Sequence, residues 1–171
     1  MELKELSERT KELFGIEDIN DLGNELRKAC SDEEKLQAFY DLVDGDLETD
    51  WLQMIYQYYQ ADRKEKKQDY TPKSLARFMS LLAGSADHVT DLCAGSGALI
   101  IQRWAMHPDT KFTAVEIDEN VFPYLMFNMV IRNISCKLYR ADSLDELQPI
   151  EAYLIKRGER FGTVSDIKPT L

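Results

Sequence analysis

The sequence predicts an α/β fold in which an N-terminal helical segment precedes a sheet of parallel strands. In residues 1–70 apolar residues recur at steps of three and four, which is typical of helices. From residue 71 short apolar runs alternate with segments of helical length, which is typical of β-α-β units. Charge divides the chain at the same point, because residues 1–70 carry 10 basic and 19 acidic residues and residues 71–171 carry 11 and 12. We therefore expect an acidic helical segment over residues 1–67 and an α/β domain over residues 68–171.

The composition narrows the class of protein. Of the 171 residues 44% are hydrophobic and 30% are charged, which are the proportions of a globular protein. No apolar run has the ~18–20 residues of a membrane span and the polar N-terminus does not resemble a signal peptide, so we expect a cytoplasmic protein with no membrane partner. The three cysteines form no metal-binding or disulfide pattern. The net charge of −10 disfavours unaided, non-specific binding to DNA phosphates.

The helical segment is expected to contain two helical regions. The first spans residues 2–14 and ends at Gly15, and the second runs from Ser31 to Tyr59 with a break at Asp44-Gly45-Asp46. The second region carries an acidic cluster whose spacing fits a solvated helix face better than a calcium loop: Asp41, Asp44, Asp46, Glu48 and Asp50. The charged run over residues 61–68 is expected to be a solvated helix end or a linker.

The α/β domain is expected to begin with a helix. Thr71 would cap this helix, with Pro72 at its first position and an apolar face formed by Leu75, Phe78, Met79 and Leu82. Strands are expected over residues 88–93, 111–117 and 136–141 and near residues 161–167, and helices over residues 98–106 and 118–132 separate the first three strands. Because strands joined by helices pair in parallel, we expect a Rossmann-like sheet.

A glycine-rich turn joins the first strand to the next helix. In Ala94-Gly95-Ser96-Gly97, glycine lets the chain turn tightly and lets a ligand approach the backbone. Such turns lie at the carboxyl ends of the strands, where open α/β sheets bind their ligands. Glu116 ends the next strand about 20 residues later, which is the spacing of a carboxylate that binds ribose hydroxyls. Together these residues indicate a ligand that contains adenosine.

Two residues favour S-adenosylmethionine (SAM) over NAD as that ligand. The NAD fingerprint requires a third glycine where this chain has Ile100. Asp91, on the strand side of the turn, would repel a pyrophosphate but attract the cationic groups of SAM. A packing turn with an N-capping acid, in an unrelated α/β protein, stays open as an alternative interpretation of the motif.

Four motifs stand in order along the chain: Gln68-Asp-Tyr-Thr-Pro-Lys-Ser-Leu-Ala-Arg-Phe-Met79, Asp91-Leu-Cys-Ala-Gly-Ser-Gly97, Val115-Glu-Ile-Asp-Glu119 followed by Tyr124-Leu-Met-Phe-Asn-Met-Val-Ile-Arg-Asn133, and Ala141-Asp-Ser-Leu144. With these motifs residues 66–145 resemble the N6-adenine DNA methyltransferases, in particular the modification subunits of type I restriction-modification systems. The resemblance implies a SAM-dependent methyltransferase sheet and transfer of a methyl group from SAM to adenine in DNA, without a metal. It also implies DNA contacts through partner subunits, such as a restriction-modification specificity subunit.

The resemblance implies a place for each site residue around SAM. Tyr70, Thr71 and Pro72 would lie near the methionine carboxylate, at a helix N-terminus whose unpaired N–H groups suit an anion. Asp91 would face the methionine amino group. Ala94, Gly95 and Gly97 belong to the turn that would pass beneath the cofactor. A plain helix cap stays open as the alternative for Thr71 and Pro72.

The resemblance also assigns residues to the adenosine half of SAM. Glu116 would bind the ribose hydroxyls, and Ile117 would lie against the adenine ring. Asp142 would accept a hydrogen bond from the adenine amino group, with Ser143 adjoining. As an alternative, Asp142 and Ser143 would only cap a short helix over residues 143–148.

The family's catalytic motif is where the chain departs from the pattern. The family carries Asn/Asp-Pro-Pro-Tyr/Phe after its fourth strand, where the polar group holds the target amino group and the aromatic ring stacks on the flipped base. Here the strand near residues 161–167 would correspond, and it is followed by Lys168, Pro169, Thr170 and Leu171. Only the proline matches, because lysine cannot accept a hydrogen bond and leucine stacks poorly. We therefore expect an incomplete methyltransferase sheet; the alternative is a catalytically inactive SAM-binding or protein-interaction module.

Overall fold

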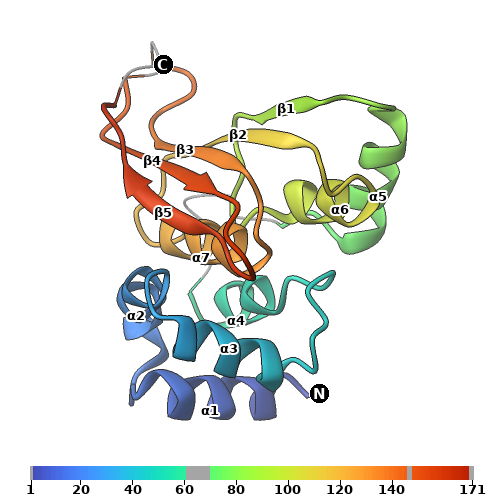
Figure 1. The fold of residues 1–171 in the computed structure, drawn as a ribbon. Coiled ribbons are helices and arrows are strands. Elements are labelled where there is room, and N and C mark those ends of the chain that lie inside the picture. Colours follow the sequence, from blue (N-terminus) through green and yellow to red (C-terminus); the bar gives the residue numbers. More distant parts are fainter. Residues whose placement is uncertain (1, 61–69, 146–147, 170–171) are drawn as a thin grey trace.

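The computed structural model describes residues 2–60, 70–145 and 148–169 and shows a mixed α/β architecture (Figure 1). The N-terminal part contains α1 (Leu3–Phe14), a short 3-10 helix (Ile19–Asp21), α2 (Leu22–Ala29), α3 (Glu33–Leu42) and α4 (Trp51–Tyr59). The second part contains α5 (Lys73–Leu82), β1 (His88–Asp91), α6 (Ala98–Met106), β2 (Lys111–Glu116), α7 (Phe122–Ile131), β3 (Cys136–Arg140), β4 (Glu151–Lys156) and β5 (Thr163–Asp166). The predicted linker over residues 61–68, with the boundary at residues 67 and 68, lies outside the described residues.

The helical segment follows its predicted outline. The first helix is confirmed as α1, and Gly15 ends it in the left-handed conformation at φ 68°. The predicted break is also confirmed, because Asp44 and Gly45 both have positive φ between α3 and α4. Helix α2 was not predicted.

The acidic cluster does not form the predicted solvated helix face. Most of it lies in the loop over residues 43–50 between α3 and α4, which we name the anchor loop. Asp46 accepts hydrogen bonds there from the backbone N–H groups of Glu48 at 3.1 Å and Thr49 at 3.2 Å. Asp50 is only 8% exposed and caps α4 by accepting from the Gln53 N–H at 3.0 Å. Short acidic side chains stabilise turns and helix starts in this way, and they therefore favour a loop here over a continuous helix.

The sheet is mixed rather than parallel throughout. Its strand order is β1-β2-β3-β4-β5. The expected parallel pairing is confirmed for β1, β2 and β3, but β4 runs antiparallel to β3 and β5 antiparallel to β4. The expectation fails because residues 141–150 are too few for a crossover helix, so the chain returns in the opposite direction as β4. Strand β4 was not predicted, whereas the strand expected near residues 161–167 is confirmed as β5.

Helix α5 differs from its prediction at its start and on its apolar face. Pro72, not Thr71, is the N-cap residue, and it makes no side-chain cap hydrogen bond. The helix packs against α6 through the small residues Ala76 and Ser80, which are buried. This packing leaves five large side chains of α5 between 47% and 65% exposed: Leu75, Phe78, Met79, Leu81 and Leu82.

Helix α7 joins the two parts of the molecule. Figure 1 shows α7 beneath the sheet and above the N-terminal helices, and all ten of its residues are buried. Phe127 makes edge-to-face contacts with Phe14 of α1 and Phe39 of α3, with ring centroids 6.0 and 5.2 Å apart. The larger of two clusters of buried apolar residues extends from Leu6 to Phe161, so the helical segment and the sheet share a core. Within the described residues, no helix is long and apolar enough to span a membrane.

Candidate functional site

The turn between β1 and α6 has the backbone that its glycines predict. Gly95 and Gly97 have φ angles of 56° and 99°, a region that L side chains rarely adopt. A Cβ atom at Gly97 would lie 2.9 Å from Met129 Cε, so this glycine also lets the turn pack closely on α7. A Cβ atom at Gly95 would lie 3.5 Å from the Tyr70 ring. The turn is tied to the sheet by Ala94, whose N–H donates to the Val115 carbonyl at 2.9 Å.

Glu116 lies at the end of β2 and bonds directly to this turn. Its Oε2 accepts a hydrogen bond from the Gly95 N–H at 2.8 Å, and its Oε1 accepts one from the Asp118 N–H at 2.8 Å. The side chain is buried, and this burial raises the pKa of its carboxyl, while the bonds from the backbone N–H groups act in the opposite direction. A carboxylate oxygen accepts more than one hydrogen bond, so hydroxyl donors of a ligand can also bind to this carboxylate.

Asp91 is the last residue of β1, and only one of its two carboxylate oxygens accepts a hydrogen bond from a described residue. Its Oδ1 accepts from the Cys93 N–H at 3.2 Å, whereas Oδ2 is buried and has no hydrogen-bond partner among the described residues. Burial raises the pKa of this carboxyl above its ordinary value. An unpaired buried carboxylate oxygen is costly, and a cationic donor would relieve that cost.

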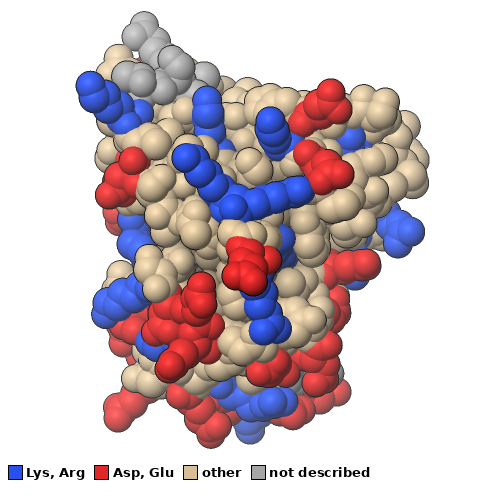
Figure 2. All heavy atoms as spheres, viewed as in Figure 1, with Lys and Arg blue, Asp and Glu red and all other residues tan. Residues whose placement is uncertain are grey.

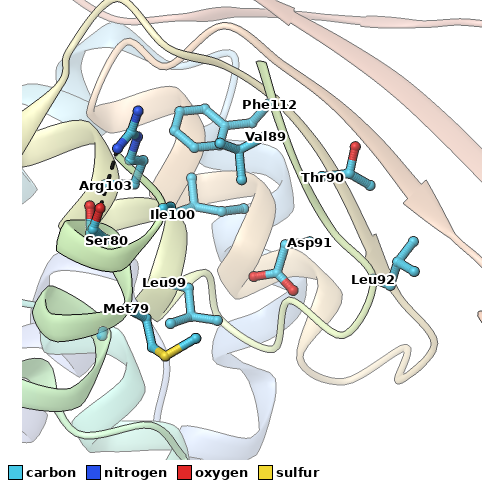
Figure 3. Close-up of a pocket in the computed structure, with 12 residues that line it drawn as sticks. Met79, Ser80, Val89, Thr90, Asp91, Leu92, Leu99, Ile100, Arg103 and Phe112 are labelled. Carbon is cyan, nitrogen blue, oxygen red and sulfur yellow. Dashed lines mark hydrogen bonds between the residues drawn. The ribbon is translucent and has the colours of Figure 1, made fainter. Parts of the chain in front are cut away.

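An apolar groove of about 350 Å³ runs beside β1, between α5 and α6. Figure 3 shows Met79 and Leu99 on one side of it and Val89 and Phe112 on the other. Of the predicted site residues, only Asp91 lines this groove. The groove and the glycine turn are therefore neighbours, because Asp91 lines the groove and ends the strand that leads into the turn.

Tyr70 brings the segment before α5 to the glycine turn. Its ring lies against Gly95 and meets Tyr56 of α4 edge to face, at 5.9 Å between centroids. Burial raises the pKa of the Tyr70 hydroxyl, which therefore stays protonated. Thr71 and Pro72 follow and lead into the N-terminus of α5.

The segment after β3 adjoins the same strand ends. Ala141 N–H donates to the Glu116 carbonyl at 3.2 Å, and Ser143 Oγ lies 3.6 Å from Cys93 Sγ after β1. Asp142 accepts from the Leu144 N–H at 2.8 Å, and residues 143–145 form a turn rather than the start of the alternative short helix, whose residues 146–147 lie outside the described chain. Ile117 is 53% exposed, so its side chain is free to contact a ligand.

Lys168 and Pro169 lie at the end of the described chain. They follow β5, which forms the edge of the sheet opposite β1. Three strands separate β5 from the strand that leads into the glycine turn.

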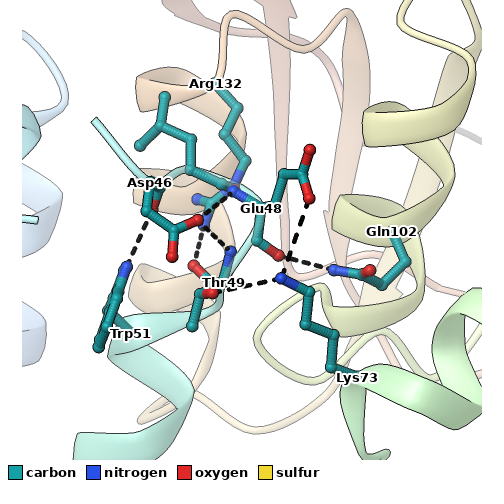
Figure 4. Close-up of polar contacts among 8 residues, drawn as sticks. Asp46, Glu48, Thr49, Trp51, Lys73, Gln102 and Arg132 are labelled. Carbon is teal, nitrogen blue, oxygen red and sulfur yellow. Dashed lines mark hydrogen bonds and ion pairs between the residues drawn. The ribbon is translucent and has the colours of Figure 1, made fainter. Parts of the chain in front are cut away.

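A buried polar network behind the turn was not predicted. Asp50 of the anchor loop accepts hydrogen bonds from Ser96 Oγ at 2.7 Å and from Asn128 Nδ2 at 3.0 Å. Arg132 donates to the carbonyls of Leu47 at 2.7 Å and Thr49 at 3.0 Å. Figure 4 shows Arg132, Gln102 and Lys73 converging on the anchor loop. One signal was present in the sequence, because Asn128 is a lone amide within the apolar helix α7.

The surface reflects the uneven charge of the sequence. Figure 2 shows acidic side chains gathered over the N-terminal helices in the lower half of that face, while basic side chains are more frequent over the sheet. The acidic surface of the N-terminal helices would repel a polyanion, and the surface over the sheet would repel it less.

A family model described as N-6 DNA Methylase matches residues 45–155. The match includes the glycine turn, Glu116 and Asp142, and it extends on the N-terminal side into the anchor loop and α4. It ends within β4, before Lys168 and Pro169. Neither a curated protein nor a solved structure matches the chain.

Proposed function

The chain belongs to the N-6 DNA methylase family, and on this premise we propose that it binds SAM and acts in methyl transfer to the N6 atom of adenine in DNA. We propose further that the sheet is part of a Rossmann-like methyltransferase sheet, with the helical segment over residues 1–67 and the cofactor domain over residues 68–171. As in the modification subunits that the chain resembles, DNA would be engaged together with partner subunits, among them a specificity subunit.

The observation that carries this proposal is the meeting of three strand ends around one turn. Gly95 bonds to Glu116 at 2.8 Å, and Ser143 after β3 lies beside Cys93 after β1. Parallel strands β1, β2 and β3 bring Glu116 and the segment after β3 to the carboxyl ends of the sheet, where we propose that they hold the ribose and the adenine. This is the crevice in which open α/β sheets bind ligands.

The polar atoms of the site fit SAM better than a dinucleotide. Asp91 Oδ2 is buried and has no partner within the described part of the chain, and the methionine ammonium group is a cationic donor of the kind it lacks. A pyrophosphate in that position would be repelled by Asp91 and by Glu116. Glu116 offers two carboxylate oxygens as acceptors for ribose hydroxyls, and the exposed Ile117 supplies an apolar surface for adenine.

When bound, SAM supplies a methyl group on a cationic sulfur. The residues of this chain bind and orient it: Asp91 and the start of α5 would hold the two charged ends of the methionine part, and Glu116 would hold the ribose. Positioning of the two reactants provides most of the rate in such a transfer, because the reacting groups need no covalent help from the protein.

The acceptor side of the reaction is proposed to come from a partner chain. The groups that hold the adenine amino group in the family are an Asn or Asp side chain and an aromatic ring, and Lys168 and Pro169 offer neither. These two residues also follow the edge strand farthest from β1. We therefore expect methyl transfer by this chain only in the presence of partner subunits.

Calorimetric titration of the purified chain with SAM, and separately with NAD, tests the cofactor assignment. We expect micromolar binding of SAM and no heat with NAD. Binding of NAD in preference to SAM, or no binding of either, would overturn it. Transfer of labelled methyl groups from SAM to adenine-containing DNA, with and without partner subunits, then distinguishes an active subunit from an inactive SAM-binding module.

A further inference from the structure

Asp50 connects three elements through one carboxylate. Its Oδ1 accepts from the Gln53 N–H at 3.0 Å, which caps α4, and from Asn128 Nδ2 of α7 at 3.0 Å. Its Oδ2 accepts from Ser96 Oγ of the glycine turn at 2.7 Å. Hydrogen bonds to a charged acceptor are about twice as strong as bonds between neutral groups, so these contacts hold the three elements firmly.

Ser96 is the residue of the turn that receives this support. It lies between Gly95 and Gly97 and is fully buried, with 0% exposure. Its carbonyl accepts a second hydrogen bond from Asn128 Nδ2 at 2.9 Å. The turn is therefore bonded at two residues. Ser96 is bonded to α7 and the anchor loop, and Gly95 is bonded to Glu116 at the end of β2. Glycine restricts the backbone less than other residues do. Without the contact to Asp50, the turn would therefore have more conformational freedom at Gly95 and Gly97.

Arg132 holds Asp50 and Asn128 in place. Its guanidinium donates to the Asn128 Oδ1 at 2.7 Å, which directs the amide N–H₂ group toward Asp50 and Ser96. It also donates to two carbonyls of the anchor loop, those of Leu47 and Thr49. The side chain is 3% exposed, and burial lowers its pKa to about 10, so it remains a cation at neutral pH beside the Asp50 charge.

We propose that Asp50 is a positioning residue for the glycine turn, through which the N-terminal helical segment preorganises the cofactor site. This inference rests on the proposed binding of SAM. A turn fixed before binding loses less conformational freedom when the ligand arrives, and a segment outside the α/β domain thereby sets cofactor affinity. The family match begins at residue 45, so it includes Asp50 and most of the anchor loop.

The test compares Asp50→Asn with Asp46→Asn in the full chain. Both substitutions remove one negative charge of the anchor loop near Arg132, but only Asp50 contacts the turn. The first measurement is amide hydrogen exchange of residues 95–97 without any ligand, where we expect roughly tenfold faster exchange in Asp50→Asn and no change in Asp46→Asn. The second is SAM affinity by calorimetry, where we expect a loss of roughly five- to thirtyfold in Asp50→Asn alone.

The variant Ser96→Ala separates positioning from a general loss of stability. It should reproduce both effects of Asp50→Asn, and the double variant should be no worse than Asp50→Asn alone, because that substitution already disrupts the contact with Ser96. Unchanged exchange in the turn, or faster exchange with unchanged SAM affinity, would overturn the inference. A chain that binds no SAM before any substitution would instead refute the proposed cofactor, and the exchange measurement would still decide whether Asp50 holds the turn.

Discussion

The backbone N–H of Gly95 donates a 2.8 Å hydrogen bond to the carboxylate of Glu116 and so joins the turn after β1 to the end of β2. The second oxygen of this carboxylate accepts from the Asp118 N–H, also at 2.8 Å. Two backbone donors thus fix the direction of the carboxylate before a ligand arrives. A ribose would meet an acceptor that needs no reorganisation, which favours binding.

Replacing Glu116 with alanine should weaken SAM binding by ~1.5–3 kcal/mol, the range for hydrogen bonds to a charged acceptor. The substitution removes the proposed ribose acceptor and leaves the Gly95 N–H without its partner. Calorimetry gives the affinity, and Glu119→Ala is the matched control because that acid is exposed on the same loop. Equal affinity in the wild type and Glu116→Ala would mean that the ribose assignment is wrong.

Asp91→Asn should change stability and SAM binding in opposite directions. The buried Oδ2 has no partner among the described residues, so removing the charge should raise the free energy of unfolding of the ligand-free chain by about 1 kcal/mol. The same change removes the proposed partner of the methionine ammonium group and should weaken SAM binding. Urea denaturation and calorimetry measure the two effects. A variant that is both less stable and equally able to bind SAM would contradict this role.

The raised pKa of Asp91 predicts how both properties depend on pH. An acid whose pKa is higher in the folded than in the unfolded chain makes the fold bind more protons, so its contribution to stability decreases as pH rises from the ordinary aspartate value through the raised one. SAM binding should follow the opposite course and be lost as pH falls through the raised pKa, because the proton neutralises the carboxylate. Calorimetric titrations over a pH series should show this loss in the wild type, and Asp91→Asn should remove that part of the pH dependence.

Gly97→Ala should destabilise the fold by about 2–4 kcal/mol, because strain of the backbone adds to a steric clash. The residue has a φ of 99°, and its new Cβ atom would lie 2.9 Å from Met129 Cε and 3.1 Å from Leu125 Cδ1. Gly15→Ala is the control, since Gly15 also has positive φ (68°) but nothing lies within 4 Å of a Cβ there. We expect about 1 kcal/mol for that change, measured by urea denaturation. If both variants lost the same free energy of unfolding, the close contact between Gly97 and α7 would contribute nothing to the effect of Gly97→Ala.

The parts of the site that the sequence predicted are those encoded locally. Glycine at residues 95 and 97 follows from the φ angles of a tight turn, and the position of Glu116 follows from the length of one β-α-β unit. Parallel pairing of β1, β2 and β3 then brings these residues together without further information. The spacing of these residues along the chain was sufficient to predict their arrangement, because it depends only on elements that follow one another in the sequence.

The parts that the sequence did not predict depend on contacts between distant segments. Asp50 and Ser96 are 46 residues apart, and nothing in the local pattern distinguishes Asp50 from its acidic neighbours in the anchor loop. The direction of β4 depends on the short connection after β3, where no strand was expected.

The exposed face of α5 gives a test of the fold that is independent of any ligand. Phe78 and Leu82 are 54% and 65% exposed, so Phe78→Gln and Leu82→Gln should each change the free energy of unfolding by less than about 0.5 kcal/mol. Ala76 is fully buried against α6, and Ala76→Leu should cost about 1–3 kcal/mol, because the added atoms have no space. Urea denaturation of the three variants compares the two faces of one helix. A loss of more than about 2 kcal/mol in Phe78→Gln would show that this face is covered in solution, because a half-exposed side chain contributes too little to the fold to account for such a loss.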